Sequence, residues 1–196
     1  MDENSKTIKS YELNAEEYIQ SRSVDDQQKF STWIAEALSK LNKPIDIFEI
    51  GSGPGYTADY LESLGYRVTR SDIVNEFINF NQSSGKYIVR HNVATDAIPR
   101  VFDAVLAINV MQHLNSKDME KSLLYINDGL KKGGLFIFTI TLGKNDEWHD
   151  DKGGARYFAG WQKEKLIDIL NKAGLQVIYD KDVGYKNWIN IISKKT

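Results

Sequence analysis

The sequence predicts an α/β protein with a mainly parallel sheet that helices cover on both faces. From residue 45 onward, short apolar segments alternate with longer segments of helical periodicity. Glycines at positions 65, 85, 133, 134 and 174 stand at the breaks, where helices end and turns form. The last two apolar segments, 175–182 and 186–193, have only Val183-Gly184-Tyr185 between them. No helix fits there, so we expect the sheet to end in an antiparallel hairpin.

The elements follow in a simple order. Residues 7–20 and 25–41 predict two helices, and Pro44 prevents further helix before the first strand. We therefore expect one domain over 1–196, with an N-terminal helical cap (1–43) and a core of sheet and helices (44–196). The other expected strands are 45–50, 66–71, 86–91, 102–109 and 134–141, and the other expected helices are 56–64, 74–84, 116–130 and 162–173.

Composition excludes several classes of protein. The 196 residues suffice to bury a sheet-and-helix core, and a net charge of −2 provides no electrostatic footprint for nucleic acid or a membrane. The chain has no cysteine, which excludes disulfides and thiolate metal sites and suits a reducing compartment. It has no apolar run for a signal peptide or a membrane span. We expect a cytoplasmic protein, and the sequence predicts no oligomeric state.

Residues 45–73 carry the strongest functional signal. An apolar strand runs into Gly51-Ser52-Gly53-Pro54-Gly55, and a helical segment and a second strand follow, with Asp72 at the end of that strand. Such a turn lets the backbone approach a ligand, and an acid at the end of the next strand can bind two ribose hydroxyls. The segment therefore predicts a nucleotide site.

Two details argue against a dinucleotide in this site. The fingerprint G-x-G-x-x-G would place its third glycine where Tyr56 stands. Glu49 precedes the first glycine by two residues, and its carboxylate would repel a pyrophosphate in a partly desolvated site. A ligand with a cationic end suits this position better.

Four motifs in order resemble those of the class I S-adenosylmethionine-dependent methyltransferases. They are FEIGSGPG (48–55), SDI (71–73), VFDAVLAINVMQHL (101–114) and LKKGGLFIFT (130–139). The resemblance covers residues 45–142, and the tail fits the same family. It implies a three-layer Rossmann-like fold whose seven-stranded sheet has the order 3-2-1-4-5-7-6. It also implies direct in-line methyl transfer from S-adenosylmethionine, with S-adenosylhomocysteine as the product.

The resemblance assigns most of the cofactor-binding residues. The turn residues that would line the methionine portion are Gly51, Ser52, Gly53 and Gly55. Glu49 would lie close to the ammonium group. Asp72 would accept from both ribose hydroxyls, its other role being to cap the next helix, and Ile73 would contact the adenine.

The loops after the third and fourth strands complete the expected cofactor site. Asn92 stands where the family often has an aspartate that accepts from the adenine amino group, and the Val93 N–H can donate to a ring nitrogen. Asp96 is the alternative acceptor, after a shift in register. The backbone of Asn109 and Val110 is expected to approach the cofactor.

The sequence leaves two roles open for His113 and two for the residues of the N-terminal helix. His113 is either a general base near the transferring methyl group or a packing residue, because many enzymes of this family need only in-line positioning. Tyr11 and Tyr18 share one helical face. Tyr18 and Arg22 either reach the cofactor or an acidic substrate, or belong to plain packing.

The segment 145–161 is expected to be a loop that acts as a substrate lid. Its lining residues would be Trp148, His149, Arg156, Tyr157 and Phe158, with Tyr157 a second catalytic candidate. His149-Asp150-Asp151 does not predict a metal site, because three adjacent residues rarely converge on one ion. No metal is expected.

A small molecule is the expected methyl acceptor, through O, N, S or C. Enzymes that methylate nucleic-acid amino groups usually carry Asn/Asp-Pro-Pro-Tyr/Phe after the fourth strand, where this chain has Asn109-Val110-Met111-Gln112. The alternatives are a nicotinamide-dependent oxidoreductase of related fold and a protein that binds S-adenosylmethionine without catalysis. A closed methyl-side pocket would indicate the latter, and an open one beside Tyr18, His113 and Tyr157 an enzyme.

Overall fold

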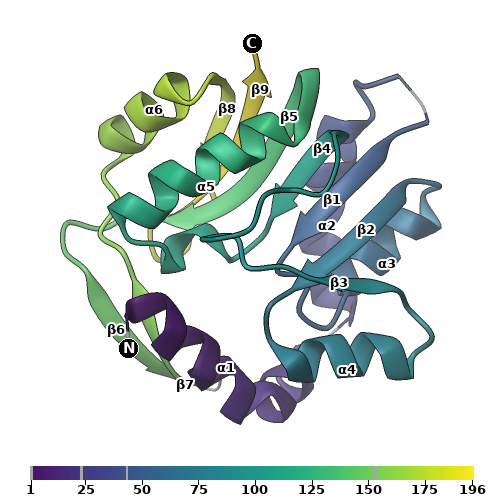
Figure 1. The fold of residues 1–196 in the computed structure, drawn as a ribbon, viewed down its shortest axis with the longest axis vertical. Helices are drawn as coiled ribbons and strands as arrows, with labels where there is room; N and C mark the ends of the chain where they lie inside the picture. Colours follow the sequence, from purple (N-terminus) through teal and green to yellow (C-terminus); the bar gives the residue numbers. More distant parts are fainter. Residues whose placement is uncertain (1, 23, 43, 152–153) are drawn as a thin grey trace.

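A seven-stranded sheet forms the centre of the molecule (Figure 1) in a computed structural model that describes residues 2–22, 24–42, 44–151 and 154–196. Its order is β3-β2-β1-β4-β5-β9-β8. The strands are β1 (Asp46–Ile50), β2 (Arg67–Asp72), β3 (Ile88–Arg90), β4 (Phe102–Ala107), β5 (Leu130–Thr141), β8 (Leu175–Asp182) and β9 (Trp188–Lys195). Strands β1 to β5 pair in parallel, and β9 is antiparallel to both neighbours. The predicted sheet order and terminal hairpin are confirmed.

Helices cover both faces of this sheet because its buried strands present apolar side chains alternately to the two sides. One core contains Phe48 of β1 with α5 (Ser116–Asp128) and α6 (Lys163–Lys172). The other contains Ile47 of β1 with α2 (Val24–Leu38) and α3 (Tyr56–Ser63). The predicted three-layer architecture follows from these two cores.

The first helix, α1 (Glu3–Gln20), lies beside α4 (Asn75–Ser83) and the segment that follows β5 (Figure 1). Glu12 Oε1 accepts a hydrogen bond from the Asn75 backbone N–H at 2.7 Å, at the N-terminus of α4. Thr7 Oγ1 accepts one from the backbone N–H of Tyr157 at 3.1 Å. Helix α1 therefore bridges parts of the chain far apart in sequence, whereas α2 packs into the core with α3.

The segment 145–161 differs from the expected loop. Within it, β6 (Glu147–Asp151) and β7 (Gly154–Phe158) form a separate two-stranded antiparallel sheet. The expectation that this segment is a loop is therefore wrong, because it contains a β-hairpin. A hairpin fixes which side chains share a face, since neighbours along a strand point to opposite sides.

Several element ends also differ from the expected bounds. Helix α1 begins at Glu3, because the side chain of Asp2 accepts from the backbone N–H of Ser5 at 2.7 Å and caps the helix. The connection from β8 to β9 spans 183–187, where Lys186 and Asn187 have positive φ. Among the described residues, no helix is long and apolar enough to cross a membrane.

Candidate active site

The glycine turn after β1 has the backbone conformation that its sequence indicates. Gly51, Gly53 and Gly55 have φ of 65°, 53° and 86°, values that disfavour other residues. A Cβ on Gly51 would lie 2.5 Å from Cγ2 of Val110. A Cβ on Gly53 would meet no atom within 4 Å, and this glycine lines two neighbouring cavities. At Gly53 the backbone is thus open to a ligand.

A polar cluster behind the turn holds it in place. The buried guanidinium of Arg70 on β2 donates to Asp59 and Glu62 of α3 at 2.7 Å each, and to Asn81 Oδ1 at 3.2 Å. Asn81 on α4 donates in turn to the carbonyl oxygen of Gly53 at 2.8 Å. We did not single out Arg70 or Asn81 in the sequence. Arg70 could have been identified from the sequence, because it is a charged residue within a strand that is expected to be buried.

Glu49 on β1 is a buried carboxyl group beside this turn. It is 2% exposed, and its Oε2 has no hydrogen-bond partner among the described residues. Burial raises the pKa of Glu49 to about 7, since a desolvated site disfavours the charged form. It lines the third cavity, of about 50 Å³, together with Tyr18, Arg22 and the glycine turn. A cationic ligand group there would provide the missing partner.

Asp72 closes the turn from the end of β2. Its Oδ2 accepts from the Gly53 backbone N–H at 2.8 Å, and its Oδ1 from the Val74 backbone N–H at 2.9 Å. Burial raises the pKa of Asp72 to about 6. Asp72 also lines the first cavity. Val74 precedes α4, and the backbone N–H of Asn75, the first helical residue, donates to Glu12, so the expected capping of α4 falls to Glu12 instead of Asp72.

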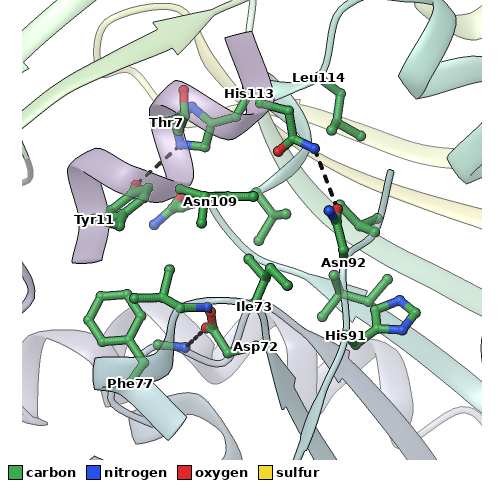
Figure 2. A pocket seen from close by; sticks show the side chains of 18 of the residues that line it. Thr7, Tyr11, Asp72, Ile73, Phe77, His91, Asn92, Asn109, His113 and Leu114 are labelled. Atoms are coloured by element: carbon green, nitrogen blue, oxygen red, sulfur yellow. Dashed lines mark hydrogen bonds between the residues drawn. The ribbon is translucent and has the colours of Figure 1, made fainter. Parts of the chain in front are cut away.

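The first cavity, of about 100 Å³, lies between α1 and the carboxyl ends of the strands. Figure 2 shows Tyr11 of α1 on one side, with Asp72, Asn92 and Asn109 around the opening. Predicted residues that line it are Tyr18, Gly51, Gly53, Asp72, Ile73, Asn92, Val93, Asn109, Val110 and His113. Three predicted residues, Arg22, Glu49 and Ser52, line the third cavity instead, and Gly55 stands behind the turn against Arg70.

The two candidate acceptors for the adenine amino group, Asn92 and Asp96, occupy different positions relative to the first cavity. Asn92 and Val93 line the first cavity, whereas Asp96 is exposed and does not. Asp96 Oδ2 accepts from the backbone N–H of Asn92 at 2.8 Å, and Asn92 Oδ1 accepts from that of Ala94 at 3.0 Å. Asp96 thus holds the loop, and Asn92 keeps the place next to the cavity. His91, which we did not predict, lines the cavity too.

Asn109 holds the strained corner after β4. Its φ of 59° is uncommon for a residue other than glycine, although asparagine tolerates it better than most. Its backbone N–H donates to Thr139 Oγ1 at 2.8 Å, and that hydroxyl donates to Asn109 Oδ1 at 3.0 Å. The corner places Asn109 at all three cavities.

His113 has both ring nitrogens in hydrogen bonds. Nδ1 lies 2.6 Å from the carbonyl oxygen of Tyr157, which can only accept, so Nδ1 carries the proton. Nε2 lies 3.2 Å from the Tyr11 hydroxyl and 3.1 Å from Gln112 Nε2. With Nδ1–H donating, Nε2 is the acceptor of these contacts. This arrangement favours the packing alternative for His113 over the general base.

Tyr11 links His113 to Arg156 of β7. Arg156 Nη1 donates to the Tyr11 hydroxyl at 2.9 Å, and that hydroxyl donates to His113 Nε2. Burial raises the pKa of Tyr11, so its hydroxyl stays protonated. Tyr11 lines the first and second cavities.

The side chain of Tyr157, unlike its backbone carbonyl, lies apart from the other candidates. It pairs with Trp148 across the β6–β7 hairpin, whereas Arg156 pairs with His149 on the opposite face. Its hydroxyl donates to Asp146 Oδ2 at 2.7 Å, and its side chain is not among those lining the three cavities. The expected lid lining thus holds for His149, Arg156 and Phe158 only. The alternation of a hairpin is the physical reason.

A second and larger cavity, of about 870 Å³, meets the first at Tyr11, Tyr18 and Asn109. The Arg22 guanidinium lies over the Tyr18 ring, 4.6 Å from its centroid, and donates to the Tyr18 hydroxyl at 3.1 Å. Both residues line the second and third cavities. Gln112, Trp33 and Asn190, which we did not predict, also line the second cavity. They come from three distant segments, and no local pattern marks them.

The glycine turn lies between two buried carboxyl groups at the carboxyl ends of the strands. In this type of fold, that arrangement defines a site for a nucleotide-type cofactor. The family model described as "Methyltransferase domain" matches residues 23–180, so the chain belongs to the methyltransferase domain family. The family predicted from the sequence is confirmed, and the oxidoreductase alternative is set aside. No curated protein sequence matches the chain.

Solved structures share the fold at low sequence identity. An S-adenosylmethionine-dependent methyltransferase from Clostridium acetobutylicum is 18% identical, with a TM-score of 0.68, over 90% of this chain and 94% of that chain. The 1,6-didemethyltoxoflavin-N1-methyltransferase from Burkholderia thailandensis is 19% identical, with a TM-score of 0.72, over 98% and 87%. The glycopeptide N-methyltransferase MtfA is 12% identical, with a TM-score of 0.70, over 85% and 92%.

Proposed function

We propose that the protein transfers a methyl group from S-adenosylmethionine to a small-molecule acceptor. The observation that carries this proposal is the pair of buried carboxyl groups, Glu49 and Asp72, on either side of the open backbone at Gly53. Glu49 Oε2 has no hydrogen-bond partner in the described part of the chain, and an ammonium group would supply one. A pyrophosphate would add negative charge beside the same carboxyl, at a cost in free energy.

The residues present fit S-adenosylmethionine from one end to the other. Glu49 would bind the ammonium, and Arg22, in the same cavity, the carboxylate of the methionine portion. Asp72 would accept from the ribose, since each of its oxygens keeps a second lone pair beyond the backbone bonds. Ile73, Asn92 and Val93 would contact the adenine.

When bound, the cofactor supplies an activated methyl group on a sulfonium. The residues of this chain then bind, orient and exclude water, and we assign no proton transfer to His113, whose ring nitrogens are both engaged. The junction of the first and second cavities, at Tyr11, Tyr18 and Asn109, is the place where an acceptor can approach the cofactor. Helix α1, with Tyr11 and Tyr18, is the proposed cap over the site.

Two observations favour an enzyme that acts on a small molecule over a non-catalytic binding protein. The second cavity opens beside Tyr18 and Arg156 and has a volume within the usual range of small-molecule sites. A structural neighbour, the 1,6-didemethyltoxoflavin-N1-methyltransferase, has the small molecule 1,6-didemethyltoxoflavin and S-adenosylhomocysteine bound. We do not propose a nucleic-acid substrate, and the cytoplasmic location remains a prediction from the sequence.

Calorimetric titration tests the cofactor. We expect S-adenosylmethionine and S-adenosylhomocysteine to bind and NAD not to bind. Glu49→Gln should weaken both sulfur ligands by about 1–3 kcal/mol, because it removes the charge opposite their ammonium. Glu36→Gln, on the surface of α2, serves as the control and should bind normally. A preference for NAD would end this proposal.

A further inference from the structure

The second cavity has a chemical character of its own that indicates the class of acceptor. Its walls come from α1, the β6–β7 hairpin and the β8–β9 end of the sheet. It meets the first cavity at Tyr11, Tyr18 and Asn109, whereas Asn92 on the adenine side belongs to the first cavity alone. A molecule in the second cavity would therefore reach the junction without entering the adenine region.

Basic side chains outnumber acids in this cavity. The basic residues are Arg22, Arg156, Lys181 and Lys186. Among the described lining residues Asp182 is the one acid, and its Oδ1 already accepts from the Gly184 backbone N–H at 2.7 Å. Within the described part of the chain, neither Lys181 nor Lys186 forms an ion pair, and Lys186 lies over the ring of Tyr185 at 5.2 Å. Their charge is available to an anion.

Buried polar atoms without partners lie in the same walls. Gln112 and Asn190 are only 1% and 7% exposed, and in the described residues neither Gln112 Oε1 nor Asn190 Oδ1 has a hydrogen-bond partner. The same holds for the indole Nε1 of Trp33. Buried polar groups in native proteins are nearly always paired, so this cavity is suited to a ligand with polar substituents.

Flat rings make up much of the remaining surface. Aromatic residues from five elements (α1, α2, β7, β8 and β9) and one loop contribute, among them Trp33, Phe158, Tyr179, Tyr185 and Trp188. The ring of Phe158 stacks on that of His149, with centroids 4.3 Å apart and planes 19° apart. Such walls favour a planar ligand, which can stack on one ring and meet another edge-on.

We propose that the methyl acceptor is an anionic aromatic compound, its acidic group bound by Lys181 and Lys186 and its ring held among the aromatic side chains. The inference rests on the proposed function, because it places the acceptor against the junction with the cofactor site. Charge, unpaired buried polar atoms and aromatic walls occur together in this one cavity. A cationic acceptor would not match the first of these features, and an aliphatic acceptor would not match the third.

Two probes of the same shape and different charge test the proposal. The protein of residues 1–196 is first saturated with S-adenosylhomocysteine, and 1-naphthoate and 1-naphthamide are then titrated by calorimetry. We expect naphthoate to bind about tenfold more tightly than naphthamide, since only naphthoate carries the negative charge that pairs with the lysine ammonium groups. The double variant K181Q/K186Q should lose that tenfold preference and bind naphthamide as before.

The matched control is K117Q/K132Q, which removes two exposed lysines outside the cavities and should keep the preference for naphthoate. Equal binding of both probes, binding of neither, or a preference that survives in K181Q/K186Q overturns the inference. The saturation step separates this failure from that of the proposed function. If S-adenosylhomocysteine itself does not bind, the cofactor assignment fails; if it binds and naphthoate is not preferred, only the acceptor class fails.

Discussion

The carboxylate of Asp72 accepts a hydrogen bond from the backbone N–H of Gly53 at 2.8 Å. This bond ties the end of β2 to the turn that follows β1, two neighbouring parallel strands whose carboxyl ends meet at one edge. Its other oxygen holds the Val74 N–H at the start of α4. One side chain thus shapes the turn and presents its remaining lone pairs to the first cavity.

Asp72→Asn should weaken S-adenosylhomocysteine by about 1–3 kcal/mol, because an amide keeps one acceptor oxygen but loses the charge. Calorimetry measures the change. The control is Asp96→Asn, which alters an exposed acid after β3 that does not line the cavities. If Asp96→Asn loses affinity and Asp72→Asn does not, the binding role belongs to Asp96.

Glu49 makes the stability of the ligand-free protein depend on pH. Its pKa is about 7 in the folded protein against an ordinary value of 4.5, so the folded protein binds more protons than the unfolded chain between these values. The free energy of unfolding should therefore fall as pH rises from about 4.5 to about 7, by up to about 3 kcal/mol. Asp72, whose pKa is raised to about 6, adds a change of the same sign.

Urea unfolding between pH 5 and pH 8 measures this slope for the native protein and for Glu49→Gln, which should have a flatter profile. The affinity for S-adenosylmethionine should change in the opposite direction and rise with pH through 7, because the ammonium binds the ionised carboxylate. Identical stability profiles for the two proteins would contradict the assigned burial of Glu49.

Gly53→Ala and Gly65→Ala form a matched pair for the glycine turn. Both glycines have positive φ, 53° and 84°, and a Cβ at either would meet no atom within 4 Å. Each substitution should therefore cost about 1–2 kcal/mol of stability, from the left-handed backbone alone. Only Gly53→Ala should also weaken S-adenosylhomocysteine, because its methyl group projects into the cavity. Equal affinities of the two variants would remove Gly53 from the site.

His113 is expected to hold the loop around the junction. His113→Ala should lower the free energy of unfolding by about 1–3 kcal/mol, because the buried carbonyl of Tyr157 loses its donor. His113→Asn supplies an amide donor in place of Nδ1–H and should restore most of that loss. With any acceptor the protein methylates, His113→Asn should keep most of the activity, whereas loss of a general base would cost about 10²–10⁴-fold.

The predicted site residues that the structure brings together at the glycine turn are local in the chain. Glu49, Gly51 and Gly53 lie within five residues, and the strand–turn–helix unit around them places them at one sheet edge whatever the rest of the fold does. The position of Asp72 follows from the next strand. The segment 145–161 lacks such a rule, because its two strands pair only with each other and their position depends on packing against α1 and the residues after β4. That packing leaves the Tyr157 side chain outside the three cavities.

The sequence by itself determined the fold class through its hydrophobic periodicity, which short stretches of the chain encode. It determined the family through four short motifs, and the order of the sheet is what the resemblance to that family implies. Only the tertiary structure decided what surrounds the acceptor. Trp33, Gln112, Lys181 and Asn190 meet in one cavity although they come from distant segments. Their juxtaposition depends on how α2, the η1 turn (Met111–His113) and the β8–β9 hairpin pack together, and packing between distant elements leaves no periodic trace in the sequence.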